Sequence, residues 1–449
     1  MLNAGLYRRH LEVLDQRLTD ALERAGRQGL ALGGVLFHAG RAQTYHADDE
    51  EIVFWATPHF RRWVPLAGPE HVVLARPGRK PLVVRVLPRD YWFDLAPPPA
   101  SYWEQEVELK DVESFEQVAS ALGSLNRIAY VGNSAEAAST LGIEADRVEP
   151  AALMAPLDWH RASKTDYEIA LMEQAARMAA QGHARAREAF VAGATELEIH
   201  YAYLRGVEQL ERQLPFGTIV ALDHKASILH YQHKRGAESV PAKLLLLDAG
   251  ASFGGYASDV TRTWVSPDCD PTMIALVHGM DRLEQELVAQ VRPGQSYVEI
   301  HEAAHRGVAE LLAESGIVKT GAAAAFERGL TRTFLPHGVG HHLGIQVHDI
   351  GGRQAGPEGG TLPPPKSYPF LRNTRTLEPG HVVTIEPGLY FIAMLLEPLR
   401  QGEHGAEIDW GLVERLSRFG GVRIEDNVVC TSDGARDLTR PLIPGPRGV

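Results

Sequence analysis

The sequence predicts an α+β protein, with a smaller α/β domain over residues 1–158 and a larger domain over residues 159–449. Two observations support this. Apolar residues recur at helical spacing in some segments and at strand spacing in others, and a proline-containing segment, 150–161, separates two such sets. The 449 residues are 44% hydrophobic and 23% charged, which is typical of a folded chain with more than one core.

The first domain is expected to begin with an amphipathic helix over residues 6–27. Four strand-like stretches and one helical stretch follow, at 30–37, 71–75, 81–87 and 127–131 for the strands and near 112–122 for the helix. Strands mixed with helices indicate an α/β unit, and residues 150–161 are expected to be its exit linker.

The second domain is expected to carry four helices with N-terminal signals. These signals are capping boxes or an aspartate before proline, at Thr165 with Glu168, Thr195 with Glu198, Asp270 with Pro271, and Ser296 with Glu299. Strand signals lie between and after the helices, at 243–249, 257–265, 382–386 and 421–429, and the proline-rich segment 356–370 is expected to be an irregular loop. Hairpins among helices indicate an α+β domain.

Composition excludes several classes of protein. A net charge of −12 argues against a nucleic-acid or membrane partner, which would favour a basic surface. Two cysteines, Cys269 and Cys430, exclude a disulfide scaffold and a cysteine-built metal site. The N-terminus does not read as a signal peptide and no apolar run of about 18 residues occurs, so a cytoplasmic location is expected.

Two aspartates flank a predicted hairpin. Asp248 ends a run of four leucines, Asp259 opens the next strand-like run, and Gly254-Gly255 lies between them as a turn signal. Antiparallel pairing would place the two carboxylates opposite each other, or one position from opposite. Buried acids placed in this way repel, so a cation is expected there, unless they are merely two aspartates beside a turn.

Three histidines recur at spacings of four and seven, at His337, His341 and His348. Gly338 and Gly340 argue against a helix, so this is not a helical zinc motif, and they would allow the backbone to pass close to a ligand. A single histidine would more often be a hydrogen-bonded core residue, whereas three that converge indicate a site.

Two glutamates complete the inventory. Glu386 lies in an apolar strand that Pro-Gly ends, and Glu425 lies inside another strand-like run. Either carboxylate could instead form a salt bridge, for example with Arg423. Taken together, two Asp, two Glu and at least one His match two divalent cations in charge and favour Mn²⁺, Co²⁺, Fe²⁺ or Zn²⁺. Such a pair can share a water and lower its pKa toward neutrality.

A serine hydrolase is the alternative from another class. Residues 250–254 match the pattern Gly-x-Ser-x-Gly, in which the serine is the nucleophile. That motif must connect a strand to a helix, and the residues after Gly254 are strand-like, so the required context is missing.

The five residues Asp248, Asp259, His341, Glu386 and Glu425 resemble the ligand signature of the pita-bread metallopeptidases. The stretches HGVGHHLGIQVHD, LRNTRTLEPG and GVRIEDNVV are similar to those of prolidases, the Xaa-Pro dipeptidases, and the resemblance covers nearly the whole chain. The bacterial subgroup includes the organophosphorus acid anhydrolases. The resemblance implies a pita-bread catalytic domain behind the N-terminal domain, hydrolysis of Xaa-Pro dipeptides, and a homodimer.

The resemblance also implies a role for each ligand. Asp248 and Asp259 would bind one ion, and Asp259, His341 and Glu386 would bind the other. Glu425 would bridge them, and Glu386 would also handle the proton of the attacking hydroxide. Two ions per subunit are expected, with Mn²⁺ first and Co²⁺, Fe²⁺ or Zn²⁺ as alternatives.

Further residues are implied around the substrate. His348 would stabilise the oxyanion of the scissile carbonyl, and His230 and Arg372 would hold the dipeptide's carboxylate. Arg423 is expected to be a second pocket arginine, and His337 a pocket residue rather than a ligand.

Three more residues concern the pocket wall and the dimer. Relatives project residues of the N-terminal domain toward a neighbour's active site, and Asp49 and Trp92 are the candidates here. Phe216 stands where tyrosine is expected in bacterial relatives, which argues more against organophosphate hydrolysis than against peptide hydrolysis. The remaining alternatives are an Xaa-Pro aminopeptidase that acts on longer peptides and a catalytically silent pita-bread binding module.

Overall fold

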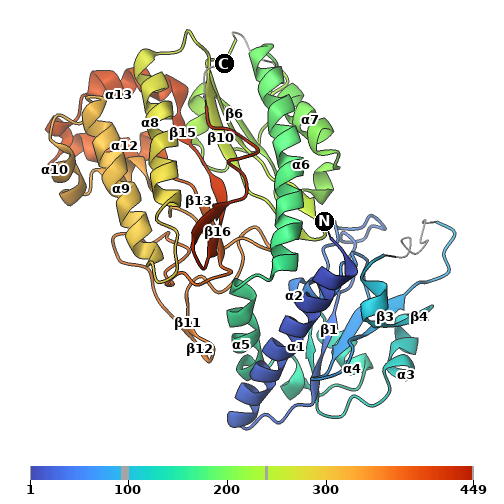
Figure 1. The fold of residues 1–449 in the computed structure, drawn as a ribbon. Coiled ribbons are helices and arrows are strands. Elements are labelled where there is room, and N and C mark those ends of the chain that lie inside the picture. Colours follow the sequence, from blue (N-terminus) through green and yellow to red (C-terminus); the bar gives the residue numbers. More distant parts are fainter. Residues whose placement is uncertain (1, 93–100, 238–240, 447–449) are drawn as a thin grey trace. The chain divides into compact units, whose positions relative to one another are not determined.

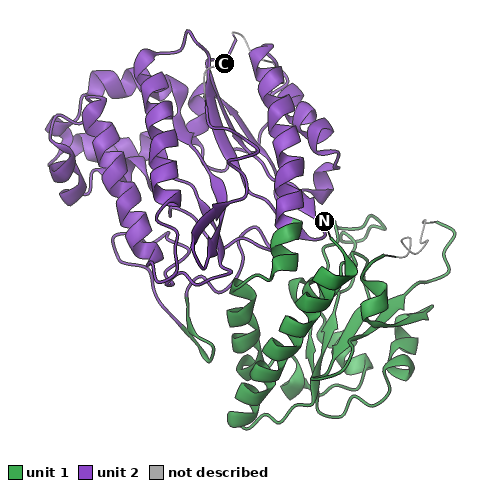
Figure 2. Cartoon of the chain, in the orientation of Figure 1, with its two compact units in different colours: residues 1–171, 354–360 green, residues 172–353, 361–449 purple. Residues whose placement is uncertain are grey.

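The computed structural model describes residues 2–92, 101–237 and 241–446. Its chain divides into two compact units, residues 1–171 with 354–360 and residues 172–353 with 361–449 (Figure 2). The predicted domain boundary at residue 158 falls inside a helix. The units divide later because that helix packs against the first helix of the chain, and Glu168 forms a buried ion pair with Arg62 of the same unit.

Unit 1 is built on one mixed sheet (Figure 1). Its strands are β1 (Gly34–His38), β2 (Val72–Ala75), β3 (Leu82–Val86), β4 (Glu108–Val112) and β5 (Ile128–Val131), in the order β4-β3-β2-β1-β5. Its helices are α1 (Ala4–Arg27), α2 (Pro58–Trp63), α3 (Val118–Leu122), α4 (Ala135–Thr140) and α5 (Ala151–Ala162). β1–β5 and β3–β4 are parallel and the other pairs antiparallel, which confirms an α/β unit.

Two predictions for unit 1 were wrong. The expected linker at 150–161 is helix α5, in which Pro150 is the N-cap and Pro156 is buried inside the helix. The expected helix at 112–122 begins at Val118, after a 3₁₀ turn, and strand β4, with its mostly exposed and charged residues, was not predicted. Packing between elements outweighs local propensity in both places.

Unit 2 places its strands between two layers of helices (Figure 1). The helices are α6 (Asp166–Val191), whose start belongs to unit 1, α7 (Glu196–Val207), α8 (Pro271–Val288), α9 (Tyr297–Glu314), α10 (Ala322–Glu327), α11 (Thr331–Phe334), α12 (Ala393–Gln401) and α13 (Trp410–Leu416). The capping boxes at Thr165 and Thr195 are present and Asp270 caps α8, whereas Ser296 makes no side-chain cap bond.

The strands of unit 2 form several small sheets. They are β6 (Ile219–Leu222), β7 (Leu244–Asp248), β8 (Ser252–Phe253), β9 (Tyr256–Ala257), β10 (Thr261–Val265), β13 (Val382–Ile385), β14 (Gly388–Tyr390), β15 (Gly421–Arg423), β16 (Asp426–Thr431) and β17 (Gly434–Asp437). The sheet orders are β10-β7-β6, β13-β16-β17, β14-β15 and β8-β9. The loop expected at 356–370 overlaps a short hairpin of β11 (Gln354–Gly356) and β12 (Gly359–Thr361), and residues 354–360 of it belong to unit 1.

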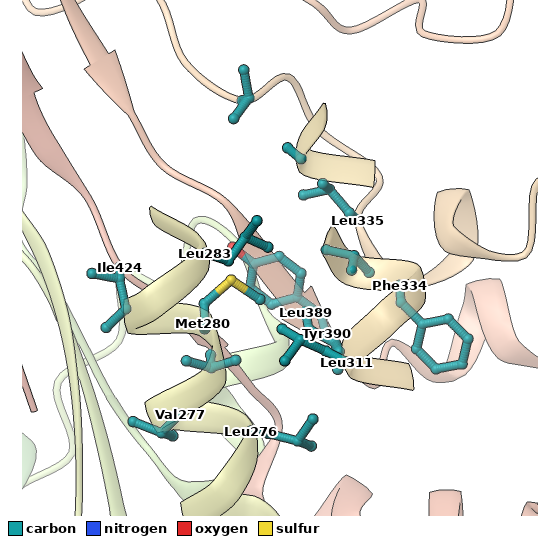
Figure 3. Packing of buried hydrophobic residues seen from close by; sticks show 14 of the residues in the cluster. Leu276, Val277, Met280, Leu283, Leu311, Phe334, Leu335, Leu389, Tyr390 and Ile424 are labelled. Carbon is teal, nitrogen blue, oxygen red and sulfur yellow. The ribbon is translucent and has the colours of Figure 1, made fainter. Parts of the chain in front are cut away.

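The leucine run of β7 is explained by helices on both faces. Leu245 and Leu247 join the core formed with α6 and α7, and Leu244 and Leu246 join the core formed with α8 and α9. Successive side chains of a strand point to opposite faces, so a strand that is covered on both faces is apolar throughout. Figure 3 shows the second core, in which residues of α8 such as Met280 pack near Tyr390 and other strand residues.

Candidate metal centre

The four predicted carboxylates and His341 converge where strands of unit 2 end or break. Asp248 ends β7, Asp259 precedes β10, Glu386 follows β13, and Glu425 lies between β15 and β16. His341 Nε2 lies 3.5 Å from Asp259 Oδ2 and 3.6 Å from Glu386 Oε1. Asp259, His341 and Glu425 each offer a ligand atom within 4.8 Å of the others. We call these five residues the ligand cluster.

The hairpin register differs from the expected one. Asp248 pairs with Thr261, and Asp259 lies two residues before Thr261. Gly254 and Gly255 form the turn with positive φ, as predicted. An offset of two residues preserves the face of a strand, so the two carboxylates still lie on the same side. Because residues 250–254 lead into this hairpin and not into a helix, the serine-hydrolase alternative is excluded.

The backbone passes close to β13 at His341. Thr384 N donates to His341 O at 2.9 Å, and His341 N donates to Thr384 Oγ1 at 3.1 Å. Gly340 precedes this contact with a φ of +150°, and a Cβ there would lie 2.2 Å from Thr384 O. The segment is not helical, as predicted. Glycine is required at position 340 because only a hydrogen atom fits between this backbone segment and β13.

The cluster is withdrawn from water. Asp248, Asp259, His341 and Glu425 are 9%, 5%, 4% and 2% exposed. Burial, reinforced by Asp259, raises the pKa of Asp248 to about 7, although Arg423 opposes this shift. Burial and the neighbouring carboxylates also raise the pKa of Glu386 and Glu425. Burial opposes charge on His341, but Asp259 and Glu386 outweigh it and raise its pKa. These shifts mean that the carboxyl groups resist being ionised together, and a cation bound among them would favour the ionised forms.

Arg423 lies within this cluster and not on an open pocket wall. Its guanidinium donates to Asp248 Oδ2 at 2.6 Å, to Tyr390 OH at 3.0 Å and to Thr261 Oγ1 at 3.1 Å, and the residue is 4% exposed. This placement differs from the predicted pocket role. The contacts indicate that Arg423 orients Asp248 and partly compensates its charge.

The donor set fits divalent cations. Asp248 Oδ1 is buried and has no hydrogen-bond partner among the described residues, so one ligand oxygen is left free. An unsatisfied buried carboxylate oxygen is costly unless a cation or hydrogen bond satisfies it. Four carboxylates against the single charge of Arg423 leave a surplus that one or two divalent ions would balance, with oxygen and imidazole donors that suit Mn²⁺, Co²⁺, Fe²⁺ or Zn²⁺.

The other predicted residues of unit 2 lie around the cluster. The ring of His348 stands perpendicular to that of His341, with centroids 4.4 Å apart. Partial burial lowers the pKa of His348 to about 4, and the positive charges of His341 and Arg372 contribute to this shift. Burial, followed by Arg423, lowers the pKa of His337 to about 3, and His230 contributes to both shifts. His230, His348 and Arg372 are exposed. His337 is partly buried, and its Nε2 lies 2.9 Å from Tyr390 OH.

Two predicted residues, Asp49 and Trp92, belong to unit 1. Both are exposed, Trp92 to 75%. Their expected role toward a neighbouring subunit stays a prediction. Phe216 is partly buried. Its ring would lie 3.0 Å from a Cβ built on Gly250, so the ring packs against the backbone at Gly250, two residues after Asp248.

Several supporting residues were missed, yet a simple signal marks them. Each lies two positions from a ligand, on the same face of its strand. Thr261 donates to Glu425 Oε2 at 2.7 Å, Thr384 Oγ1 donates to Glu386 Oε1 at 3.4 Å, and Asn427 Oδ1 accepts from Asp259 N at 3.0 Å. Because strand side chains alternate, a polar residue two positions from a candidate ligand faces the same site. It is a candidate for holding that ligand, as Thr384 does, or another ligand of the cluster, as Thr261 and Asn427 do.

A second acidic group lies beside the first. Glu284, Asp426 and Asp437 also bring carboxylate oxygens within 4.8 Å of one another. Here Arg262 pairs with Asp426 at 2.7 Å, and Arg440 pairs with Asp426 at 2.8 Å and with Glu284. We call these five residues the arginine cluster. Two guanidinium groups supply its positive charge, so it is a structural ion-pair network.

Two further properties concern the described residues only. None of the helices in those ranges is long and apolar enough to cross a membrane. Both cysteines, Cys269 and Cys430, are buried and free, as expected from their number.

Comparisons with known proteins show which family the chain resembles. The profile of metallopeptidase family M24 matches residues 170–432, and that of the Xaa-Pro dipeptidase N-terminal domain matches residues 5–159. The Xaa-Pro dipeptidase of Shewanella amazonensis is 40% identical over 441 residues, 98% of each chain. The Xaa-Pro dipeptidase of Stenotrophomonas maltophilia is 40% identical over 446 residues, 99% of this chain and 98% of the relative.

Solved structures share the fold. Aminopeptidase P from E. coli with the inhibitor Pro-Leu matches with a TM-score of 0.71 at 21% identity, over 98% of this chain and 96% of that one. Aminopeptidase PepP of Pseudomonas aeruginosa matches with a TM-score of 0.70 at 22% identity, over 99% and 96%. The predicted pita-bread fold with a separate N-terminal domain is thereby confirmed.

Proposed function

The chain belongs to metallopeptidase family M24, and we propose that it hydrolyses Xaa-Pro dipeptides to a free amino acid and proline. The observation that carries this proposal is the convergence of five ligands, four of them buried, with a surplus of carboxylate charge. The relatives named Xaa-Pro dipeptidase, 40% identical over 98% of the chain or more, support the choice of substrate.

The ligand cluster would hold two divalent cations. We assign Asp248 and Asp259 to one ion, Asp259, His341 and Glu386 to the other, and Glu425 to a bridging position. Mn²⁺ is the proposed ion, with Co²⁺, Fe²⁺ or Zn²⁺ as alternatives. When bound, the ions would polarise the scissile carbonyl and supply water of lowered pKa as the nucleophile.

Residues of the chain would direct the attack. Glu386 accepts a hydrogen bond from Thr384 and is less buried than its partners, with 17% of its side chain exposed, so it can exchange a proton with an attacking water. His348 stands beside His341 with its ring exposed, and we assign it to the developing oxyanion. His337, bonded to Tyr390, would line the pocket.

Recognition of a dipeptide requires a cation at its C-terminus. Arg372 is exposed, and its positive charge contributes to the lowered pKa of His348, so we assign its guanidinium to the dipeptide's carboxylate, with His230 as its partner. Proline in the second position gives a tertiary amide without an N–H. Activation through the carbonyl and a water does not need that N–H, which suits this bond.

One assay with two substrates tests the proposal. The purified protein is stripped with a chelator, Mn²⁺ is restored, and hydrolysis of Leu-Pro is compared with that of Leu-Pro-Gly. Cleavage of Leu-Pro alone, and only with metal, is expected. Comparable cleavage of both would favour an aminopeptidase. Cleavage of neither substrate with Mn²⁺, Co²⁺, Fe²⁺ or Zn²⁺ would contradict the proposal and favour a binding module. The same preparations can be tested for hydrolysis of a phosphotriester.

We also propose a cytoplasmic homodimer. The exposed side chains of Asp49 and Trp92 are the candidates for lining the partner's site. Light scattering on the purified chain should give twice the mass of 49.2 kDa. A monomer with full activity would remove Asp49 and Trp92 from that role.

A further inference from the structure

The segment that carries His230 is held by a buried carboxylate at the start of α7. Residues 222–235, here called the His230 segment, run from the end of β6 past a 3₁₀ turn at Asp223–Ser227. His230 is exposed at one side of this segment, while its neighbour Tyr231 is 4% exposed. The segment has little regular structure of its own, so the position of His230 depends on what holds its neighbours.

The anchor is the carboxylate of Glu196, the first residue of α7, which is 0% exposed. Lys225 Nζ lies 2.7 Å from its Oε1, and Leu222 N donates to the same oxygen at 3.1 Å. Tyr231 OH donates to Oε2 at 2.8 Å, and Arg235 N donates to that oxygen at 3.0 Å. Four donors spread over the whole segment therefore meet on one buried side chain.

The chemistry of these contacts demands a carboxylate. All four partners are donors, two at each oxygen, and an ionised carboxylate accepts at both oxygens. Glutamine would turn an NH₂ group toward two donors at one end of the contact. It would also remove the negative charge that lies 2.7 Å from the ammonium of Lys225, which is 3% exposed.

We propose that Glu196 is a positioning residue that fixes His230 for binding of the dipeptide carboxylate. This inference rests on the proposed function. Glu196 begins a helix, and the capping box of that helix uses a different acid, Glu198, whose carboxylate is exposed and bonds Thr195. The helix start is thus satisfied without Glu196, whose carboxylate serves the His230 segment.

The test compares Glu196→Gln with Glu198→Gln, the matched control on the same helical turn. Glu196→Gln is expected to raise the KM for Leu-Pro about 10-fold with a smaller change in kcat. Glu198→Gln is expected to leave KM unchanged. Tyr231→Phe removes one donor and keeps the charge pair, so it should shift KM in the same direction by less, and it provides a milder variant if Glu196→Gln folds poorly.

A double variant separates positioning from general destabilisation. In a His230→Ala background, Glu196→Gln should raise KM no further, because its effect passes through His230. Equal effects of Glu196→Gln with and without His230 would overturn the proposal.

Hydrogen exchange measured by mass spectrometry tests the anchor without substrate. Peptides covering 222–235 should exchange about 10-fold faster in Glu196→Gln and unchanged in Glu198→Gln. Unchanged exchange in Glu196→Gln would overturn the proposal. If the wild type fails to cleave Leu-Pro, the proposed function and the binding role of His230 fail together, whereas faster exchange would still show that Glu196 holds the segment.

Discussion

Glu425 and Asp426 are neighbours in the sequence, yet they belong to two buried acidic clusters of opposite character. Glu425 joins the ligand cluster, where four carboxylates meet one arginine. Asp426 joins the arginine cluster, where Arg262 and Arg440 face three carboxylates. The alternation of side chains along a strand separates the two residues.

The difference lies in how each cluster is neutralised. Buried charge is tolerated when guanidinium groups pair with it, and in the arginine cluster Asp426 and Glu284 are paired in this way. The ligand cluster has one guanidinium group for four carboxylates, whereas the arginine cluster has two for three. Asp248 Oδ1 has no hydrogen-bond partner among the described residues; Glu284 Oε1 and Asp426 Oδ2 have none either, but Asp426 Oδ2 lies 2.8 Å from Arg440 Nε. A group of buried acids therefore indicates a metal centre when the guanidinium charge around it is too small to balance the carboxylates. The presence of acids alone does not indicate one.

The largest expected effect comes from removing a ligand. Asp259→Asn should lower Leu-Pro hydrolysis by about 1,000-fold or more and reduce bound divalent metal, because it removes a charge that both ions would share. Asp437→Asn, in the arginine cluster, is the control and should retain metal and activity. Metal content by atomic emission and initial rates check both variants. Full activity of Asp259→Asn would rule out the proposed centre.

Removing an arginine tests the other cluster. Arg262 is fully buried and bonds Asp426, Thr261 O and Glu425 O, so Arg262→Met should lower the free energy of unfolding by about 3–5 kcal/mol. Urea unfolding measures this change. Adding Asp426→Asn should recover part of the loss, since it removes a buried carboxylate that would then be paired with Arg440 alone among the described residues. A purely additive loss in the double variant would contradict a charge-balance role.

Arg372 sharpens the contrast with Arg423, which is committed to Asp248. Arg372→Ala should raise the KM for Leu-Pro by about 10- to 100-fold, as expected for loss of a charge-assisted hydrogen bond of about 1.5–3 kcal/mol. The KM for Leu-Pro-amide, which lacks the carboxylate, should change little. An unchanged preference for Leu-Pro over its amide would remove Arg372 from this role.

The smallest effect concerns pH and stability. Burial, reinforced by Asp426, raises the pKa of Asp437 from 3.8 to about 6. The folded state therefore favours the protonated form, so this contribution to stability is complete below about pH 4 and is lost as pH rises through 6. Asp437→Asn should remove that loss. Urea unfolding of both proteins at pH 4, 5, 6 and 7 should show their difference in stability change over this window, and a constant difference would contradict the assignment.

Much of the fold could be predicted because its signals are local. The caps at Thr195 and Asp270, the turn at Gly254-Gly255 and the leucine run of β7 each reflect contacts within a few residues or the period of a strand. Helix α5 was mistaken for a linker because its prolines suggested a break, and β4 was missed because its residues are polar. In both, packing against distant elements decides the structure.

The sequence by itself determined the candidate metal ligands. It also determined, through the two-residue period of a strand, that Thr261, Thr384 and Asn427 share a face with Asp259, Glu386 and Glu425, because ligand chemistry and strand geometry are fixed by covalent structure. Only the tertiary structure decided that Arg423 binds Asp248 and not the open pocket, and that Asp426 faces Arg262. It also decided that Glu196 meets four donors. These contacts join segments distant in sequence, and their register follows from how whole elements pack.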